Sequence, residues 1–354
     1  MTENIPAVSV IIPMYNTEKY ISECLQSLLY QTLENIEVIV VDDCSTDNSL
    51  AVAETFIPAF ESKNKKLLTI TLKPNSGCPG IPRNIALNYA TGKYIYFMDS
   101  DDFLDSNALE DFYKVAEEFN ADVVHAKRYF EYKEIGGKFI SEFSFSDSVT
   151  RQPTLETSDI SQRMSNFIEK KYHSMIWGKF FRREFLMEND IKFPALTISE
   201  DFIFSFMCLA CAKNYVQIPF IGYHYRKRVG SVSNSSATTV KASLNLLEGV
   251  YVLDTFMKWQ NFFIENPKYQ YLVLDIFNQM FSDLIAKHIF FTKNLEPEEI
   301  YNFFSKEIFS LNPQKNIPLT AYLFVSTNIY KMLVNQQAAE IAELKKIIAE
   351  LKGD

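Results

Sequence analysis

The sequence predicts an α/β protein whose core is a parallel β-sheet. Short apolar runs rich in Val and Ile alternate with amphipathic helices over the first third of the chain, and each kind of segment has its own spacing of apolar residues. Polar or acidic clusters follow three of the first four predicted strands. Alternating strands and helices give parallel strands joined by right-handed crossovers. Because ligands bind beyond the carboxyl ends of such strands, the clusters indicate a binding cleft.

Each predicted element ends at residues that favour a stop or a turn. The first strand reaches Ile12 and ends at Pro13, which has no backbone N–H to pair. Thr17 and the residues before it cap the following helix. The expected elements are strands at 8–12, 36–41, 67–72 and 94–98, and helices at 18–30, up to about 60, and at 83–90. This order brings residues near Tyr15, Asp43 and Asp101 to one cleft, although they are distant in the sequence.

The fourth strand ends in three carboxylates within four positions, namely Asp99, Asp101 and Asp102. Carboxylates this close repel one another unless a cation neutralises them. Hard oxygen ligands at this density suit Mg²⁺ or Mn²⁺ held together with a substrate phosphate. An Asp-Ser-Asp turn without a ligand is the alternative interpretation. No Gly-rich phosphate loop follows any strand, which disfavours a dinucleotide-binding dehydrogenase or a P-loop nucleotidase.

Composition excludes several other classes of protein. The 354 residues are 47% hydrophobic and carry a formal net charge of -9, which argues against a nucleic-acid-binding surface. No apolar run reaches the roughly 18 residues that span a bilayer, and the first residues lack the pattern of a signal peptide. The five cysteines fit a reducing compartment, so we expect a cytoplasmic protein. Cys208 and Cys211 are expected in the core of a buried helix, because no second pair completes a zinc site.

Four segments, taken in order, resemble the family 2 glycosyltransferases of GT-A fold. They are Val8-Ser-Val-Ile-Ile-Pro-Met-Tyr-Asn16, Val40-Val-Asp-Asp-Cys-Ser-Thr-Asp47, Arg83-Asn84 and Asp99-Ser-Asp-Asp102. The resemblance covers roughly residues 6–235. It implies a mixed, mainly parallel sheet and an inverting, metal-dependent transferase that uses a nucleotide-activated sugar, most often a UDP-sugar.

The resemblance also implies roles for individual residues. The metal-binding Asp-x-Asp motif corresponds to Asp99 and Asp101, which would hold Mn²⁺ or Mg²⁺, and His224 is a further candidate ligand. Of two adjacent acids, Asp43 is favoured over Asp42 for contact with uracil. A helix N-cap remains the alternative for Asp43, and an aromatic-flanked, half-buried ring the alternative for His224. The residues expected to bind the nucleotide-sugar are Pro13, Tyr15, Asn16, Asp42, Asp43, Arg83, Asp99, Ser100, Arg226 and Arg228.

Inverting transfer needs a base that takes the proton of the acceptor hydroxyl. Glu200 and Asp201 open an apolar helix, and the resemblance makes Asp201 the base and Glu200 its orienting neighbour or an acceptor contact. Ordinary enrichment of acids at a helix N-terminus is the alternative. Trp177 and Lys179 are candidates for the acceptor side, although Trp177 could equally pack in the core. Gly178 stands where relatives often carry Asn, which leaves the acceptor contacts open.

Four parts are expected along the chain. Residues 1–125 and 126–235 form the nucleotide-sugar half and the acceptor half of the transferase domain, and 236–325 form a helical domain rich in Phe and Tyr. In the tail, 326–354, Val334, Ile341 and Ile348 recur at intervals of seven, which is a heptad pattern and predicts self-association. An amphipathic helix packed on its own domain is the alternative. The aromatic helices are a candidate for peripheral contact with the inner face of the cytoplasmic membrane.

The expected activity is transfer of a hexose or N-acetylhexosamine from a UDP-sugar to a sugar hydroxyl. The resemblance places the acceptor, a glycan or lipid-linked glycan, among bacterial surface polymers such as lipooligosaccharide or capsule. A catalytically silent sugar-nucleotide-binding or scaffolding subunit is the first alternative, which the presence of both acid pairs disfavours. A sugar nucleotidyltransferase is the second, which the missing Gly-rich loop disfavours.

Overall fold

The computed structural model describes residues 5–135, 138–143, 152–168, 172–196, 200–219 and 222–227, together with Lys345. The expectations for the helical segment 236–325 and for the heptad pattern in 326–354 lie outside these residues, apart from Lys345. Arg228, expected to bind the nucleotide-sugar, also lies outside them.

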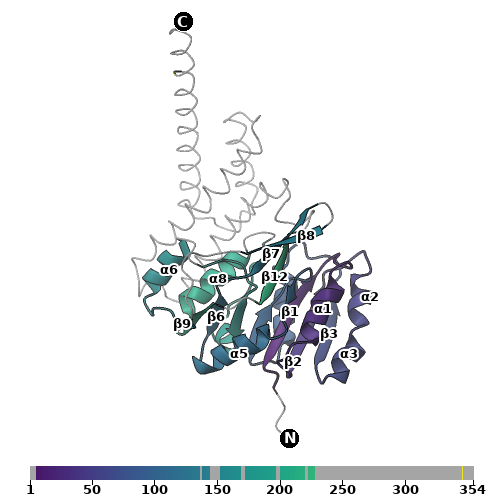
Figure 1. The fold of residues 1–354 in the computed structure, drawn as a ribbon, viewed down its shortest axis with the longest axis horizontal. Helices are drawn as coiled ribbons and strands as arrows, with labels where there is room; N and C mark the ends of the chain where they lie inside the picture. The colour runs from purple at the N-terminus through teal and green to yellow at the C-terminus, as the bar shows by residue number, and fades with distance from the viewer. Residues whose placement is uncertain are drawn as a thin grey trace, which may run out of the picture. The chain divides into compact units, whose positions relative to one another are not determined.

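An eight-stranded sheet lies at the centre of the described part, in the order β3-β2-β1-β4-β10-β6-β11-β9 (Figure 1). Its first four members pair in parallel, β10 runs antiparallel to both neighbours, β11 is parallel to β6, and β9 is antiparallel to β11. The sheet is therefore mixed and mainly parallel, as expected. The strands are β1 (Val8–Met14), β2 (Ile36–Asp42), β3 (Lys66–Thr71), β4 (Tyr94–Phe97), β6 (Val123–Ala126), β9 (Thr154–Leu155), β10 (Lys179–Arg182) and β11 (Tyr215–Ile218).

A second, four-stranded sheet has the order β5-β12-β7-β8. Its strands are β5 (Phe103–Leu104), β7 (Phe130–Ile135), β8 (Lys138–Phe143) and β12 (Tyr223–Lys227). Because β5 comes directly after the acidic turn that follows β4, its antiparallel partner β12 is carried to that turn. The second sheet thus joins residues near 100 to residues near 224.

Eight helices surround the strands in the described part of the chain. Figure 1 shows α1, α2 and α3 beside β1, β2 and β3. The single helix expected up to about residue 60 is in fact two short helices, because Pro58 lies in the first turn of the second and cannot donate a helical hydrogen bond. The helices are α1 (Ile21–Leu29), α2 (Ser49–Glu54), α3 (Ile57–Ser62), α4 (Gly80–Tyr89), α5 (Ala108–Glu118), α6 (Ile160–Ile168), α7 (Arg183–Glu188) and α8 (Glu200–Cys211).

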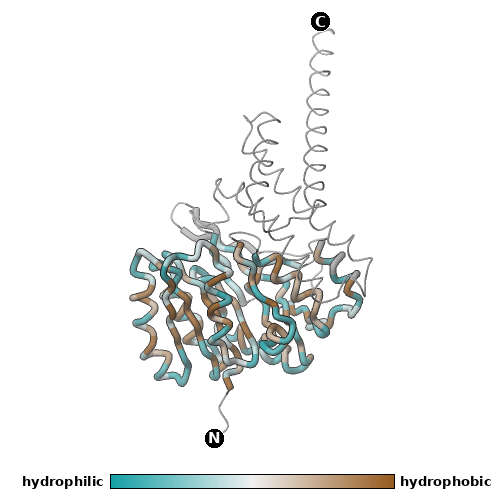
Figure 2. Tube along the Cα trace, turned by 180° about the vertical axis from the view of Figure 1, so that it is seen from behind, coloured by the Kyte–Doolittle hydropathy of each residue, from teal (hydrophilic) through white to brown (hydrophobic). Residues whose placement is uncertain are grey.

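The large sheet is covered on both faces. Successive side chains of a strand point to opposite faces, and in β4 the ring of Tyr96 packs on Phe112 of α5, with centroids 5.6 Å apart. The next ring, Phe97, packs on Phe204 of α8 at 5.5 Å. Helices α5 and α8 therefore lie on opposite faces. The strands are buried on both sides, which explains their continuous apolar sequences, and Figure 2 shows hydrophobic residues along them.

Helix α8 is apolar along nearly its whole length and is buried, so the interpretation of Cys208 and Cys211 as helix residues is confirmed. Both cysteines are free; Cys208 is buried in the core, whereas Cys211, at the end of the helix, is only partly buried. Within the described ranges, no helix combines the length and apolar character needed to cross a membrane.

Candidate active site

The three carboxylates that follow β4 have different surroundings. Asp102 is buried, and its carboxylate accepts hydrogen bonds from the Tyr223 hydroxyl and from the Arg226 backbone N–H at 2.8 Å. It therefore ties β12 to the acidic turn. Asp99 is 31% exposed and Asp101 is partly exposed. These two are the carboxylates of the turn that a ligand can reach.

Arg83, on α4, joins the acidic turn to the start of α8. Its Nη2 lies 3.0 Å from Asp99 Oδ1, and its Nη1 lies 3.0 Å from Glu200 Oε1 and 2.8 Å from Asp201 Oδ1. The guanidinium is only 3% exposed. Glu200 is 8% exposed and Asp201 is 26% exposed, so Asp201 faces the solvent side of the pair and Glu200 lies behind it. The structure thus brings Asp99 of the acidic turn and both acids of α8 to one cation.

The carboxylates of this cluster shift one another's pKa values. Loss of surrounding water raises the pKa of Asp99 to about 6, with help from Asp101 and Asp201, although Arg83 opposes the shift. Burial and the charge of Asp201 raise the pKa of Glu200 to about 8, again against Arg83. Burial is the largest cause of both shifts, and the neighbouring carboxylates add to it.

The donor set at the turn fits a divalent cation. Asp99 and Asp101 supply hard oxygen ligands on the side of the turn that solvent reaches. Among the described residues, no group of three or more His, Cys, Asp or Glu side chains is already arranged as a metal site. Two carboxylates together with substrate phosphate oxygens are a usual environment for Mg²⁺.

His224 is engaged on both ring nitrogens. Nε2 lies 2.8 Å from Asp105 Oδ1, and Nδ1 lies 3.0 Å from the Tyr132 hydroxyl. The ring is stacked between Phe103 and Phe130, with centroid distances of 4.3 and 4.9 Å. Because its donor and its lone pair both have partners, this placement does not support the expectation that His224 binds a metal, and it matches the aromatic-flanked alternative.

The two adjacent acids at the end of β2 lie in different hydrogen-bond networks. Asp43 accepts from the Ser76 backbone N–H and from its hydroxyl, both at 2.8 Å. Asp42 accepts from the Ser45 N–H at 3.2 Å and lines a cavity of about 690 Å³ with Lys73. The expected contact of Asp43 with a base remains a prediction. Ser76 is a neighbour that the sequence did not single out, because a serine in a loop carries no pattern.

The expected end of the first strand at Pro13 is wrong, because β1 continues through Pro13, which lies opposite Val41 of β2, to Met14. Tyr15 and Asn16 follow this strand at the same edge of the sheet. Tyr15 is about half exposed, and Pro13 and Asn16 are partly exposed. Asn16 has a φ of 51° and holds the loop after β2, since its Oδ1 accepts from the Thr46 N–H at 2.8 Å. Ser100 is buried. Their contacts with a nucleotide-sugar remain predictions.

Arg226 packs against α1 in this structure. Its Nη2 lies 2.8 Å from Glu23 Oε2, and its guanidinium lies 5.4 Å from the Tyr20 ring centroid and 5.1 Å from that of Phe103. The side chain is mostly buried. To contact the diphosphate as predicted, the guanidinium would have to bind the phosphate in addition to Glu23 or in its place.

The two candidates for the acceptor side lie in the interior. Trp177 is 3% exposed and stacks on Tyr223, with ring centroids 4.5 Å apart and planes 3° from parallel. Lys179 is 1% exposed and donates to backbone carbonyls. Neither placement supports contact with an acceptor, and the core alternative for Trp177 fits. Gly178 has a φ of 68°, a conformation that favours Gly or Asn, so the exchange of Asn for Gly has a backbone explanation.

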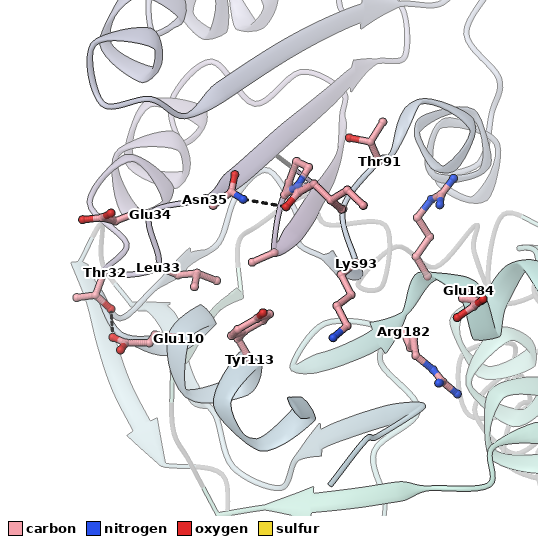
Figure 3. Close-up of a pocket in the computed structure, with 15 residues that line it drawn as sticks. Thr32, Leu33, Glu34, Asn35, Thr91, Lys93, Glu110, Tyr113, Arg182 and Glu184 are labelled. Atoms are coloured by element: carbon pink, nitrogen blue, oxygen red, sulfur yellow. Dashed lines mark hydrogen bonds between the residues drawn. The ribbon is translucent and has the colours of Figure 1, made fainter. Parts of the chain in front are cut away.

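A cavity of about 740 Å³ lies away from these carboxylates (Figure 3). Its walls include Ala7, Asn35 and Lys93, which precede β1, β2 and β4. It therefore opens at the amino-terminal edge of these strands, opposite the acidic turn. None of the predicted site residues lines it, so it is not part of the candidate active site.

This fold and site define the chain as a glycosyltransferase-type protein, with a mixed sheet, an acidic turn after β4 and an acid pair at the start of α8. The sequence model described as "Glycosyl transferase family 2" matches residues 9–188, just over half of the chain. The chain belongs to this family.

Two relatives act on the same kind of polymer. The chain is 35% identical over 233 residues to the poly(ribitol-phosphate) beta-N-acetylglucosaminyltransferase TarS of Staphylococcus aureus. The matched region covers 64% of this chain and 37% of TarS. The chain is 34% identical over 227 residues to a poly(ribitol-phosphate) beta-glucosyltransferase of Bacillus spizizenii, covering 63% and 33%. The matched region thus spans about a third of the length of each relative.

Solved structures of S. aureus TarS 1-349 share the fold. One superposes with a TM-score of 0.63 at 26% identity, covering 91% of this chain and 88% of the other. Another, in complex with UDP-GlcNAc, has a TM-score of 0.55 at 25% identity and covers 91% and 89%.

Proposed function

We propose that this chain transfers a hexose or N-acetylhexosamine from a UDP-sugar to an acceptor hydroxyl, with inversion at the anomeric carbon. The observation that carries the proposal is the Arg83 bridge, which joins the acidic turn after β4 to Asp201 at the start of α8. A donor-binding element and a candidate base are thereby held within one side chain's reach. The structure of TarS with UDP-GlcNAc supports the choice of a UDP-sugar.

Asp201 is proposed as the base. Its carboxylate is partly exposed and has both oxygens oriented, Oδ1 by Arg83 and Oδ2 by the Ile176 backbone N–H at 3.4 Å. In the proposed step it takes the acceptor hydroxyl's proton while that oxygen attacks the anomeric carbon. The bond from this carbon to the UDP oxygen breaks in the same step, and its electron pair leaves with UDP. Glu200, behind Asp201, helps to hold Arg83.

Asp99 and Asp101 are proposed to hold Mn²⁺ or Mg²⁺, which when bound would offset the charge of the leaving diphosphate. Arg83 offsets the negative charges of Asp99 and Asp201 at the same time, so it links the proposed metal site to the proposed base. A silent subunit would have no need of this arrangement, and that favours the enzyme over the scaffolding alternative.

The acceptor is proposed to be a hydroxyl-bearing polymer of a bacterial surface. Two relatives are named for transfer to poly(ribitol-phosphate), one with N-acetylglucosamine and one with glucose. They support a surface polymer as the acceptor class and leave both hexose and N-acetylhexosamine as donors. Self-association through 326–354 and contact with a membrane surface remain proposals, which sedimentation and vesicle binding of the full chain would test.

Calorimetric titration of the full chain with UDP-glucose, UDP-galactose and UDP-N-acetylglucosamine tests the donor, in Mn²⁺ and again with a chelator. We expect metal-dependent binding of at least one UDP-sugar. UDP release is then measured with a poly(ribitol-phosphate) acceptor and with lipooligosaccharide and capsular acceptors. Absence of binding to every nucleotide would contradict the proposal. Binding without UDP release from any acceptor would favour the silent subunit, and release of pyrophosphate would favour a nucleotidyltransferase.

A further inference from the structure

The short segment 173–178, which we call the 173–178 loop, contacts the candidate base through its backbone. It precedes β10 and ends at Gly178. The Ile176 N–H donates to Asp201 Oδ2 at 3.4 Å, on the opposite oxygen from the one that Arg83 holds. A long backbone contact of this kind depends on small displacements of the loop. What fixes the loop therefore affects the direction in which Asp201 points.

Three successive carbonyls of the loop are held from the protein interior. The Lys179 ammonium donates to the carbonyl of His173 at 2.9 Å and, at shorter range, to that of Met175. The Ser205 hydroxyl, one turn along α8 from Asp201, donates to the carbonyl of Ser174 at 2.8 Å. These bonds fix the peptide planes on the N-terminal side of Ile176.

Burying a lysine side chain to support a loop costs free energy, because its ammonium is removed from water. Lys179 is 1% exposed, and an ammonium in such surroundings loses most of its hydration. No carboxylate of the described residues forms an ion pair with it at contact distance. Burial lowers the pKa of Lys179 to about 7, while the nearby charge of Asp201 opposes that shift. The ammonium is thus coupled to Asp201 by charge as well as through the loop.

We propose that Lys179 is a positioning residue for Asp201. By holding the carbonyls of His173 and Met175, it sets the 173–178 loop so that the Ile176 amide orients the carboxylate for proton transfer. The inference rests on the proposed function in one respect, since it takes Asp201 as the base. It also replaces the expected contact of Lys179 with the acceptor.

The chain contains a matched control for this idea. Lys65 is also buried, and its ammonium donates to the carbonyls of Leu28, Leu29 and Gln31 at 3.3, 3.0 and 2.8 Å. These carbonyls lie in the last turn of α1 and just beyond it, and none of the candidate base's contacts involves them. Lys65→Met therefore removes the same kind of interaction as Lys179→Met without touching the 173–178 loop.

The test compares Lys179→Met and Lys65→Met in the full chain, with UDP release as the assay. We expect both variants to unfold at lower temperature. In Lys179→Met, kcat should fall about 100-fold, the cost of a misplaced reacting group, with the KM for the UDP-sugar and the Kd for UDP within twofold of the wild type. In Lys65→Met, kcat should stay within twofold. Lys179→Gln, which keeps a donor, should lie between Lys179→Met and the wild type.

The proposal is overturned if Lys179→Met lowers kcat no more than Lys65→Met, or if it changes only the KM for the donor. Amide hydrogen exchange of residues 173–178 gives a readout that needs no activity and can be made on Lys179→Gln if the methionine variant does not fold. Exchange should rise in the Lys179 variants and not in Lys65→Met; unchanged exchange also overturns the proposal. Absence of sugar transfer by the wild type would instead contradict the proposed function.

Discussion

Replacing Arg83 with methionine should destabilise the fold by about 3 kcal/mol and abolish transfer. The guanidinium makes three charge-assisted contacts of 2.8 to 3.0 Å with Asp99, Glu200 and Asp201. Removing one partner from a buried ion pair costs about 3–5 kcal/mol, because the other charge stays buried. Asp99 and Asp201 keep some contact with water, at 31% and 26% exposure, so the lower end of that range applies. Glu200, at 8%, has no such relief.

The measurement is urea unfolding of the wild type and the variant, with the free energy of unfolding taken by linear extrapolation. Lys93→Met is the control, because Lys93 pairs with Glu117 and both side chains are exposed, at 48% and 37%. A pair of this kind contributes about 0–1 kcal/mol. Arg83→Lys should fall between the two, since one ammonium keeps the charge but cannot span three carboxylates.

The reasoning would be refuted if Arg83→Met lost less than about 1 kcal/mol, or no more than Lys93→Met, because the carboxylate cluster would then not depend on its cation. Loss of stability with transfer retained would refute only the part that concerns the active site. In that case Arg83 would serve the fold and not the orientation of Asp201.

Three other changes have defined outcomes. Asp101→Ala should abolish UDP release and metal-dependent binding of the UDP-sugar while leaving the unfolding temperature nearly unchanged, since this carboxylate is partly exposed; retained turnover would contradict its assignment to the metal. Gly178→Ala should cost about 1–2 kcal/mol because its φ is 68°, whereas Gly178→Asn should cost less, and equal urea midpoints would argue against backbone strain as the cause. Burial lowers the pKa of Lys65 from 10.5 to about 8, so between those pH values the unfolded chain binds more protons than the folded one. The stability of the wild type relative to Lys65→Met should therefore rise from pH 8 toward pH 10.5 and stay level below pH 8, as measured by urea unfolding at several pH values, and a level difference throughout would contradict the shift.

Local sequence was sufficient for the strands that build the site. Strands β1, β2 and β4 are apolar on both faces, and polar residues follow each of them, so both their position and their common edge could be predicted. The prediction of a single helix ending near residue 60 was wrong in detail, because the chain forms two helices there, α2 and α3, with Pro58 in the first turn of α3. The sheet formed by β5, β7, β8 and β12 was not predicted, since a two-residue strand such as β5 has no periodicity to detect.

The sequence by itself determined the class of fold, the acidic turn at Asp99 and Asp101, and the acid pair that opens α8, because each is a pattern among neighbouring residues. Only the tertiary structure decided that Arg83 connects the acidic turn to the acid pair of α8, since Arg83 lies 117 residues before Glu200 in the chain. It also decided that Lys179 is buried, with its ammonium bonded to backbone carbonyls. The physical reason is that burial and ion pairing are set by which distant segments meet, and hydrophobic periodicity records only which side of its own element a residue occupies.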